Sequence, residues 1–222
     1  MRRVLISGGS RGIGAACVEY FCAQGDAVAF LYRDNHEAAG ALTARTGALG
    51  YAVDLSDRQG ALAAAEWARE VLGAVDVLVH CAGIAQIKLF TDVTDEDWRR
   101  MIDTNLSSAF YLTRALLADM LHNKWGRIIN VGSMWGKIGA SCEVHYSAAK
   151  AGLRGMTMAL AKELGPSGIT VNCIEPGMID TEMNQELSDA TKAELVDETP
   201  MCRIGTPADV TAAVRFFASR EA

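Results

Sequence analysis

The chain has 222 residues, of which 50% are hydrophobic and 22% are charged, and these proportions exclude disordered and collagen-like classes. Its formal net charge of −6 argues against nucleic acid and anionic membranes as partners, because both are bound by clustered Lys and Arg. No apolar run reaches the roughly 18 residues of a membrane span, and Val4–Ile6 is too short for a signal peptide. We therefore expect a cytoplasmic protein with a single domain over residues 1–222.

Short apolar segments alternate with longer amphipathic ones, a pattern that predicts βαβ units and a doubly wound parallel sheet with helices on both faces. The expected strands are Arg3–Ser7, Ala27–Tyr32, Gly50–Asp54, Val75–His80, Arg127–Gly132 and Thr170–Glu175. The expected helices are Ile13–Gln24, Asn35–Thr46, Arg58–Leu72, Asp95–Asn123 with a break near Asn105, His145–Leu164, Asp180–Glu198 and Ala208–Ser219. The last helix would feed one more strand, so a seventh, edge strand is expected to be missing.

The six cysteines form no CxxC pair and show no zinc-finger spacing. With only four histidines as further ligands, we expect no metal site. The thiols are interpreted as small buried residues in a reducing compartment.

A glycine-rich loop follows the first expected strand and opens the first helix. Glycines at this position let backbone N–H groups approach a pyrophosphate, and the helix N-terminus adds partial positive charge. The spacing differs from G-x-G-x-x-G, and no Gly-Lys-Ser/Thr of a P-loop follows. The predicted phosphate-binding residues are Gly8, Ser10, Arg11, Gly12, Ile13 and Gly14.

The end of the second strand indicates the type of dinucleotide. Arg33 stands where NAD-selective sites carry a carboxylate. Together with Arg11 it would hold a 2′-phosphate, which favours NADP(H). Two alternatives are that both arginines are solvated surface residues, or that Asp34 meets a ribose hydroxyl and the site takes NAD.

A serine, a tyrosine and a lysine follow the fifth strand. Tyr146 and Lys150 are four residues apart and share one helix face. An ammonium beside a phenol favours the phenolate, so Lys150 is expected to lower the pKa of Tyr146 and make it an acid–base group at neutral pH. Ser133, at the strand end, would hydrogen-bond a substrate oxygen.

Over its whole length the sequence resembles the short-chain dehydrogenase/reductase family. The matching elements are the glycine loop, Asp54-Leu55, Ala82-Gly83, Asn105, Ser133, Tyr146 with Lys150, Pro176-Gly177 and Thr181. The resemblance implies a Rossmann-type sheet in the order 3-2-1-4-5-6 followed by the seventh strand, and assembly as a homodimer or homotetramer.

The same resemblance implies roles for these residues. Tyr146 would donate the proton, Ser133 would polarise the carbonyl, and Asn105 would hold a water of a proton relay. Lys150 would bind the nicotinamide ribose as well as lower the pKa of Tyr146. The cofactor would further meet Asp54 and Leu55 around the adenine and Ala82 and Gly83 along its length. Pro176 and Gly177 would also contact the cofactor, and Ile179 and Thr181 after them would meet the carboxamide. One departure from the family pattern is His80-Cys81 in place of Asn-Asn before Ala82.

Within the family, the glycine loop and Ile169–Met183 most resemble 3-oxoacyl-carrier-protein reductases, although Ser167 replaces an arginine of their docking surface. The segment Trp135–Val144 is instead similar to reductases of the 5-aminopentanone group on a lysine of elongation factor P. There Glu143 would attract an amine-bearing substrate, or would simply be a solvated loop carboxylate.

The sequence therefore predicts an NADPH-dependent reductase of a small or carrier-linked ketone. A non-catalytic dinucleotide-binding protein is the competing class, and it would lack the Asn–Ser–Tyr–Lys set. Apolar stripes in Asp95–Asn123 and His145–Leu164, with Phe110 and Met158 outside them, predict a homodimer through these helices. The alternative is a monomer in which both stripes are core.

Overall fold

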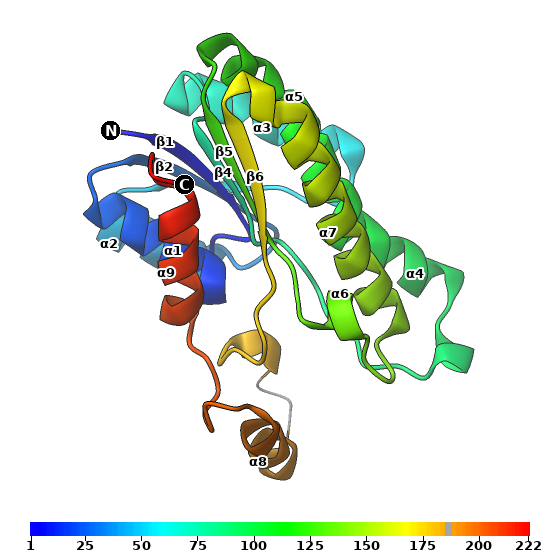
Figure 1. Ribbon diagram of the computed structural model, residues 1–222. Helices are drawn as coiled ribbons and strands as arrows, with labels where there is room; N and C mark the ends of the chain where they lie inside the picture. The colour runs from blue at the N-terminus through cyan, green and yellow to red at the C-terminus, as the bar shows by residue number, and fades with distance from the viewer. Residues whose placement is uncertain (185–187) are drawn as a thin grey trace.

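The computed structural model describes residues 1–184 and 188–222, and its centre is one parallel sheet (Figure 1). The strands are β1 (Arg3–Ser7), β2 (Ala27–Tyr32), β3 (Leu49–Ala52), β4 (Val77–His80), β5 (Gly126–Val131) and β6 (Ile169–Ile174). They pair in the order β3-β2-β1-β4-β5-β6, so the predicted fold class and strand order are confirmed. The chain direction across the sheet reverses between β1 and β4, where doubly wound folds bind ligands at the carboxyl ends of the strands.

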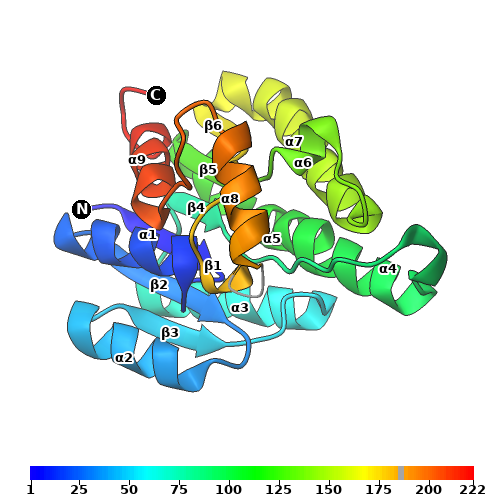
Figure 2. The same cartoon turned by 90° about the horizontal axis from the view of Figure 1, so that it is seen from below.

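Helices cover both faces of the sheet (Figure 2). On one face, α1 (Gly12–Ala23), α2 (His36–Thr46) and α9 (Pro207–Phe217) contribute Phe21, Leu42 and Val214 to a common core. On the other face, α3 (Arg58–Leu72), α5 (Ser108–Asn123) and α7 (Val144–Leu164) do the same with Ala65, Leu116 and Leu164. The central strands β1, β2 and β4 are nearly continuously apolar because both of their faces are buried, whereas the edge strand β3 is mostly exposed.

Local polar contacts fix where several helices begin. In α4 (Asp95–Ile102), the Thr94 side chain accepts from the Asp97 N–H group while the Asp97 carboxylate accepts from the Thr94 N–H group. The same capping box joins Thr206 and Asp209 at the start of α9, with Pro207 in the first turn. The Asn35 side chain caps α2, so this helix begins one residue later than the sequence predicted.

Several strand boundaries differ from the predicted ones by one or two residues. β3 ends at Ala52 instead of Asp54. The Val53 N–H group still donates to the Tyr32 carbonyl of β2, but the chain then turns, and the Asp54 carboxylate accepts a hydrogen bond from the Ser56 N–H group. β4 begins at Val77 instead of Val75, since the Asp76 side chain binds Arg3. Strands β5 and β6 begin and end one residue early.

The predicted break near Asn105 is present as a π-helical turn, η2 (Asp103–Ser107), between α4 and α5. The Asn105 side chain donates to the Met101 carbonyl and the Ser108 hydroxyl donates to the Thr104 carbonyl. These side-chain bonds compete with the regular helical ladder for backbone acceptors. Such turns are frequent at functional sites.

The predicted helix over Asp180–Glu198 is confirmed only in its second half. The chain instead forms a 3-10 turn, η4 (Glu182–Asn184), and then α8 (Asp189–Glu198), capped by the Ser188 side chain; the part of the prediction that covers 185–187 lies outside the described residues. A bond from the Asp180 N–H group to the Gly205 carbonyl holds the chain extended where a helix was expected to start. The short helix α6 (Trp135–Ile138) was not predicted.

Among the residues that the structure describes, no helix is both long and apolar enough to cross a bilayer.

Candidate active site

The glycine loop turns from β1 into α1 at the switch point of the sheet. Gly8 and Gly12 have positive φ angles of 65° and 52°, a conformation that side chains rarely adopt. A Cβ atom on Gly8 would lie 2.7 Å from the Ala82 nitrogen, and one on Gly14 would lie 2.1 Å from the Gly8 carbonyl oxygen. The loop thus needs glycine for close packing as well as for its turn. Gly9 also needs it, because its Cβ would lie 2.5 Å from that of Phe30, and the sequence interpretation missed this.

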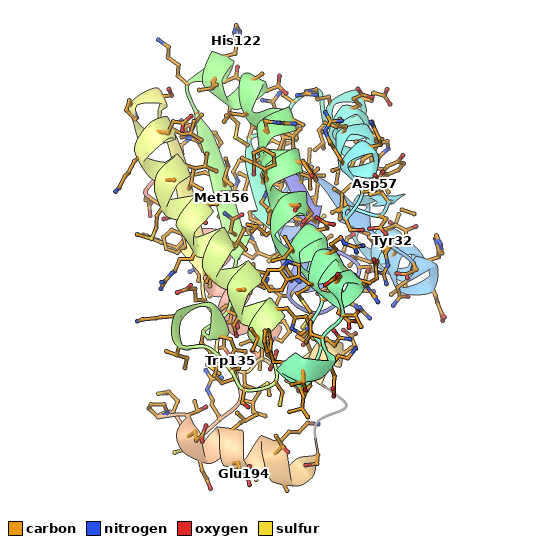
Figure 3. The ribbon with its side chains drawn as sticks, turned by 90° about the vertical axis from the view of Figure 1, so that its right-hand side faces the viewer. Tyr32, Asp57, His122, Trp135, Met156 and Glu194 are labelled. Atoms are coloured by element: carbon orange, nitrogen blue, oxygen red, sulfur yellow. The ribbon has the colours of Figure 1, made fainter. Side chains whose placement is uncertain are left out.

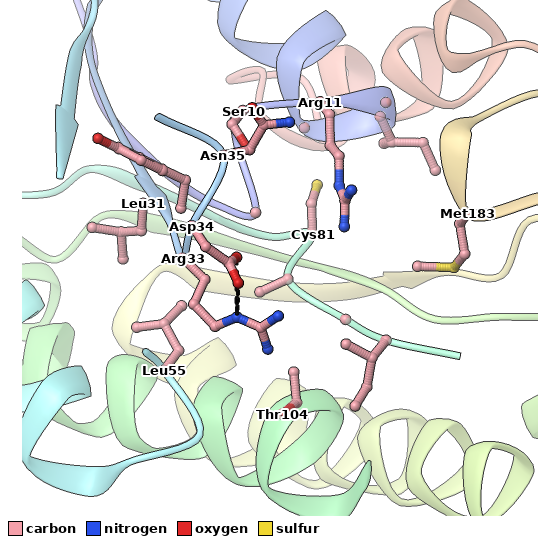
Figure 4. A pocket seen from close by; sticks show the side chains of 18 of the residues that line it. Ser10, Arg11, Leu31, Arg33, Asp34, Asn35, Leu55, Cys81, Thr104 and Met183 are labelled. Carbon is pink, nitrogen blue, oxygen red and sulfur yellow. Dashed lines mark hydrogen bonds and ion pairs between the residues drawn. The ribbon is translucent and has the colours of Figure 1, made fainter. Parts of the chain in front are cut away.

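The loop forms one wall of a pocket (Figure 4). Of the predicted cofactor residues, the pocket is lined by Gly8, Ser10, Arg11, Gly12, Ile13, Gly14, Arg33, Asp54, Leu55, Ala82, Gly83 and Thr181. Sequence reasoning did not select Asn35, Cys81, Ile84, Thr104, Glu182 or Met183, which line it too. Cys81 directly follows β4, and Ile84 and Glu182 directly follow selected residues, so adjacency in the sequence is the signal that could have found these three.

Arg33 and Asp34 lie side by side at the end of β2, on the wall of this pocket (Figure 4). Arg33 Nε is 3.0 Å from a carboxylate oxygen of Asp34, and the two side chains are 44% and 71% exposed. The bond uses Nε, and within residues 1–184 and 188–222 neither terminal nitrogen of Arg33 has a hydrogen-bond partner. Two N–H-bearing nitrogens therefore face the pocket region beside Arg11.

Asp54 lies just after β3, where it accepts hydrogen bonds from the N–H and hydroxyl groups of Ser56, at 2.9 and 2.7 Å. Burial alone would raise the pKa of Asp54, but the bonds from Ser56 and the nearby Arg33 guanidinium outweigh it and lower the pKa. The carboxylate is therefore ionised at neutral pH and can accept a further hydrogen bond.

The predicted catalytic side chains gather beyond the end of β5. Ser133, Tyr146 and Lys150 are all buried, and the Ser133 hydroxyl lies close enough to the Tyr146 phenol to act on its pKa. Lys150 Nζ lies 5.7 Å from the centre of the Tyr146 ring and donates to the Val131 carbonyl at 2.9 Å. A Cβ atom on Gly83 would lie 2.7 Å from Asn105 Oδ1 and 3.5 Å from Lys150 Nζ, so a side chain at this position has no room. None of the four predicted catalytic side chains lines the pocket itself, but Gly83, which does line it, packs against both Asn105 and Lys150.

The pKa of Tyr146 is raised, which corrects the expectation that Lys150 lowers it. Burial of the phenol is the main cause, and the Glu143 carboxylate adds to it, while the hydrogen bond with Ser133 acts in the opposite direction. Burial also lowers the pKa of Lys150 to about 8. Lys150 Nζ donates its hydrogen bond to the Val131 carbonyl and not to the phenol oxygen of Tyr146.

Asn105 is held by its side chain inside the π-helical turn. Its Oδ1 accepts from the Ile84 N–H group at 3.3 Å, and its Nδ2 donates to the Ile84 carbonyl at 3.1 Å. This pair of bonds joins the turn to the segment that follows Ala82-Gly83. Asn105 therefore sets the distance between the pocket wall at Ile84 and the helical turn to which Asn105 belongs.

His80 occupies the position of the family's first asparagine and is fully integrated into the core. Its Nε2 lies 3.0 Å from the Thr113 hydroxyl, and only 4% of the residue is exposed. Burial, and secondarily the charge of Lys150, lower the pKa of His80 to about 3. At neutral pH this histidine is therefore uncharged and joins β4 to α5.

The segment after β6 is divided between two hollows. Thr181 lines the nucleotide pocket, whereas Gly177 and Ile179 line a second cavity of about 480 Å³; Pro176 lines neither, and its carbonyl accepts from the Met134 N–H group. This volume lies within the range of small-molecule sites, about 300–1,000 Å³. Its apolar walls include Met134, Trp135, Ile138, Met178, Leu195 and Met201, and Figure 3 labels Trp135 near α8.

The described residues contain no group of three or more His, Cys, Asp or Glu side chains that could hold a metal ion.

A doubly wound sheet with this glycine loop is typical of dinucleotide-binding proteins, and comparisons with known proteins identify the family. Residues 2–192 match the family profile described as short chain dehydrogenase. The chain is 39% identical over 220 residues to the 3-oxoacyl-[acyl-carrier-protein] reductase FabG of Escherichia coli (strain K12), covering 98% of this chain and 90% of FabG.

The chain is also 40% identical over 222 residues to the acetoacetyl-CoA reductase of Rhizobium meliloti (strain 1021), covering all of this chain and 92% of that protein. Among solved structures, gox2181 superposes with a TM-score of 0.91 at 31% identity, covering 98% of this chain and 88% of gox2181. The chain belongs to the short-chain dehydrogenase/reductase family.

Proposed function

We propose that this protein is an NADPH-dependent reductase that converts a 3-oxoacyl thioester, carried by acyl-carrier protein, to the secondary alcohol. The observation that carries the proposal is the joint burial of Ser133, Tyr146 and Lys150 beside a glycine-lined nucleotide pocket. Two relatives, FabG and acetoacetyl-CoA reductase, are named for reactions on 3-oxoacyl groups. A non-catalytic dinucleotide-binding protein would have no need for this acid–base set.

The raised pKa of Tyr146 suits the reductive direction. It keeps the phenol protonated at neutral pH, so Tyr146 can donate its proton to the carbonyl oxygen as an alcohol forms. Ser133, whose hydroxyl lies close enough to the phenol to act on its pKa, would donate a hydrogen bond to the same oxygen. Bound NADPH would supply the hydride. Lys150 would hold the nicotinamide ribose.

Dinucleotide binding is supported by the shape of the pocket. The hollow lined by the glycine loop, Arg33 and Asp54 measures about 210 Å³, below the range for whole ligands, and we assign it to the adenosine-phosphate end. Arg33 presents two free nitrogens there, which favours a 2′-phosphate and hence NADPH over NADH. Ala82, Gly83, Pro176, Gly177, Ile179 and Thr181 would continue the contact toward the nicotinamide, and Asn105 would hold a relay water.

One observation favours a second substrate, the 5-aminopentanone group on a lysine of elongation factor P. Glu143 is half-buried, its pKa is raised by burial, and its charge acts on Tyr146. Within the described residues its carboxylate has no hydrogen-bond or ion-pair partner. An amine on the substrate would provide one.

An NADPH-oxidation assay tests both substrates side by side. We expect turnover with acetoacetyl-CoA as the 3-oxoacyl probe, and little effect of Glu143→Gln. A higher kcat/KM with modified elongation factor P, lost in Glu143→Gln but kept in the exposed control Glu163→Gln, would establish the second substrate instead. If neither compound is reduced, the proposed function is wrong.

We also propose that the protein is cytoplasmic and works as a homodimer or homotetramer. All six cysteines are free thiols, as a reducing compartment requires. The helices α5 and α7 lie side by side on one face of the molecule, seen in Figure 3 with Met156 labelled. On this face Phe110 and Met158 are 42% and 58% exposed, and apolar surface of this kind typically marks a partner surface.

A further inference from the structure

A polar network that the reaction does not use lies directly beside Tyr146. It begins at His145, which is 0% exposed although it is in the first turn of α7. His145 Nε2 is 2.9 Å from Gln86 Oε1, and Gln86 Nε2 is 3.1 Å from Asp97 Oδ1. Asp97 also binds Lys88 Nζ at 2.6 Å. One chain of bonds therefore connects α7, the segment after β4 and the start of α4.

The direction of every hydrogen bond in this network is determined by the ion pair at its end. Its hydrogen bond from Lys88 is the main reason that the pKa of Asp97 lies far below its ordinary value, so this carboxylate can only accept. Gln86 must therefore donate to Asp97 through Nε2, which leaves Oε1 facing His145. The His145 ring then carries its proton on Nε2 and donates to Gln86.

The remaining ring nitrogen supports this assignment. His145 Nδ1 is buried and has no hydrogen-bond partner among the described residues, as expected if it carries a lone pair instead of a proton. Burial lowers the pKa of His145, and its place at a helix N-terminus disfavours positive charge. The ring is neutral, and its single directed bond is to Gln86.

Gln86 lies two residues after Ile84, whose backbone Asn105 holds with two hydrogen bonds. The segment Ile84–Gln86 is therefore fixed to Asn105 at one end and to the residue before Tyr146 at the other. The backbone of Lys88 adds a bond to the Cys142 carbonyl at 2.8 Å, which attaches the same segment to the loop that precedes α7.

We propose that Gln86 is a positioning residue that, through His145, fixes the first turn of α7 and so aims the Tyr146 phenol at Ser133. This inference rests on the proposed function. Loss of the two Gln86 bonds would let the turn shift, and a displacement of about 1 Å at a reacting group can cost roughly a hundredfold in rate. Substrate and cofactor contacts lie elsewhere, so the effect would fall on kcat.

The test compares Gln86→Leu with Glu96→Gln, a control that breaks an exposed ion pair with Arg99 on the same helix as Asp97. We expect Gln86→Leu to lower kcat with acetoacetyl-CoA and NADPH by about tenfold to a hundredfold, with an unchanged Kd for NADPH. Amide hydrogen exchange in Val144–Ala149 should become faster. Glu96→Gln should change neither kcat nor the rate of amide exchange in Val144–Ala149.

A second pair of variants covers the case in which Gln86→Leu does not fold. His145→Gln keeps a donor near the position of Nε2 and should retain kcat, whereas His145→Leu should lose it. Wild-type kcat and wild-type exchange in Gln86→Leu, or in His145→Leu where Gln86→Leu does not fold, would overturn the proposal. If the wild-type protein reduces no carbonyl but exchange in Gln86→Leu is faster, the proposed function fails while the positioning role of Gln86 stands.

Discussion

We propose that Arg33 determines the preference for NADPH over NADH. A charge-assisted hydrogen bond to a phosphate contributes about 1.5–3 kcal/mol, which corresponds to tenfold or more in affinity. Arg33→Asp should therefore weaken NADPH binding and narrow or reverse the preference over NADH, as measured by fluorescence titration with both cofactors. Equal affinity of the wild-type protein for the two would show that Arg33 and Arg11 do not bind a 2′-phosphate.

His80 predicts how stability depends on pH. Its pKa is about 3 in the folded protein and about 6.5 in the unfolded chain, so between these values the unfolded state binds more protons. The stabilisation is complete above pH 6.5 and is lost as the pH falls toward 3, by several kcal/mol in total. Thermal unfolding of His80→Asn should therefore show a shallower fall in Tm between pH 6.5 and 4 than the wild-type protein does. Equal slopes would mean that His80 is already accessible to protons in the folded state.

The residues of the candidate site could be predicted from the sequence to different degrees. The glycine loop, Tyr146 and Lys150 are evident in the sequence because their spacing is local: a tight turn, or one helix face. The raised pKa of Tyr146 was not predictable, because it depends on how deeply the phenol is buried and on where Lys150 Nζ finds its acceptor. Gln86 was also missed, since its partners come from α4 and α7.

At the scale of elements, the contact between the segment after β4 and the π-helical turn holds the pocket wall in place. Gly83→Ala would place a Cβ atom 2.7 Å from Asn105 Oδ1, and Asn105 would have to release Ile84. We expect this variant to lose NADPH affinity and to unfold at a lower urea concentration. Gly40 lies within α2, and a Cβ atom there would meet no other atom within 4 Å. Gly40→Ala should therefore stabilise the protein by about 0.5–1 kcal/mol. Similar behaviour of the two variants would contradict the close packing at Gly83.

Hydrophobic periodicity predicts the long elements well, because α1, α3, α5 and α7 each bury one apolar stripe. It fails where backbone bonding decides the structure. The π-helical turn is set by side chains that bond to backbone carbonyls, and the segment after β6 is held by a bridge between Ile179 and Gly205. Neither contact follows from the sequence spacing of apolar residues.

At the scale of the whole molecule, the exposed apolar surface on α5 and α7 leads to a prediction about assembly. Sedimentation of the wild-type protein at micromolar concentration should give a dimer or a larger species, and Met158→Arg should shift it toward monomer because a charge would be buried in the interface. Phe216→Arg, on the opposite face of the sheet in α9, is the matched control and should leave the mass unchanged. A wild-type monomer of 23.7 kDa would rule out this interface.

The account as a whole depends on Tyr146 acting as the proton donor in an NADPH-dependent reduction. The most direct measurement is NADPH oxidation with acetoacetyl-CoA by the wild-type protein and by Tyr146→Phe, with NADPH binding to each protein measured by fluorescence. Removing the hydroxyl takes away the proton but leaves the ring and the pocket. We predict that Tyr146→Phe binds NADPH like the wild-type protein and shows no turnover; full turnover by this variant would contradict the mechanism.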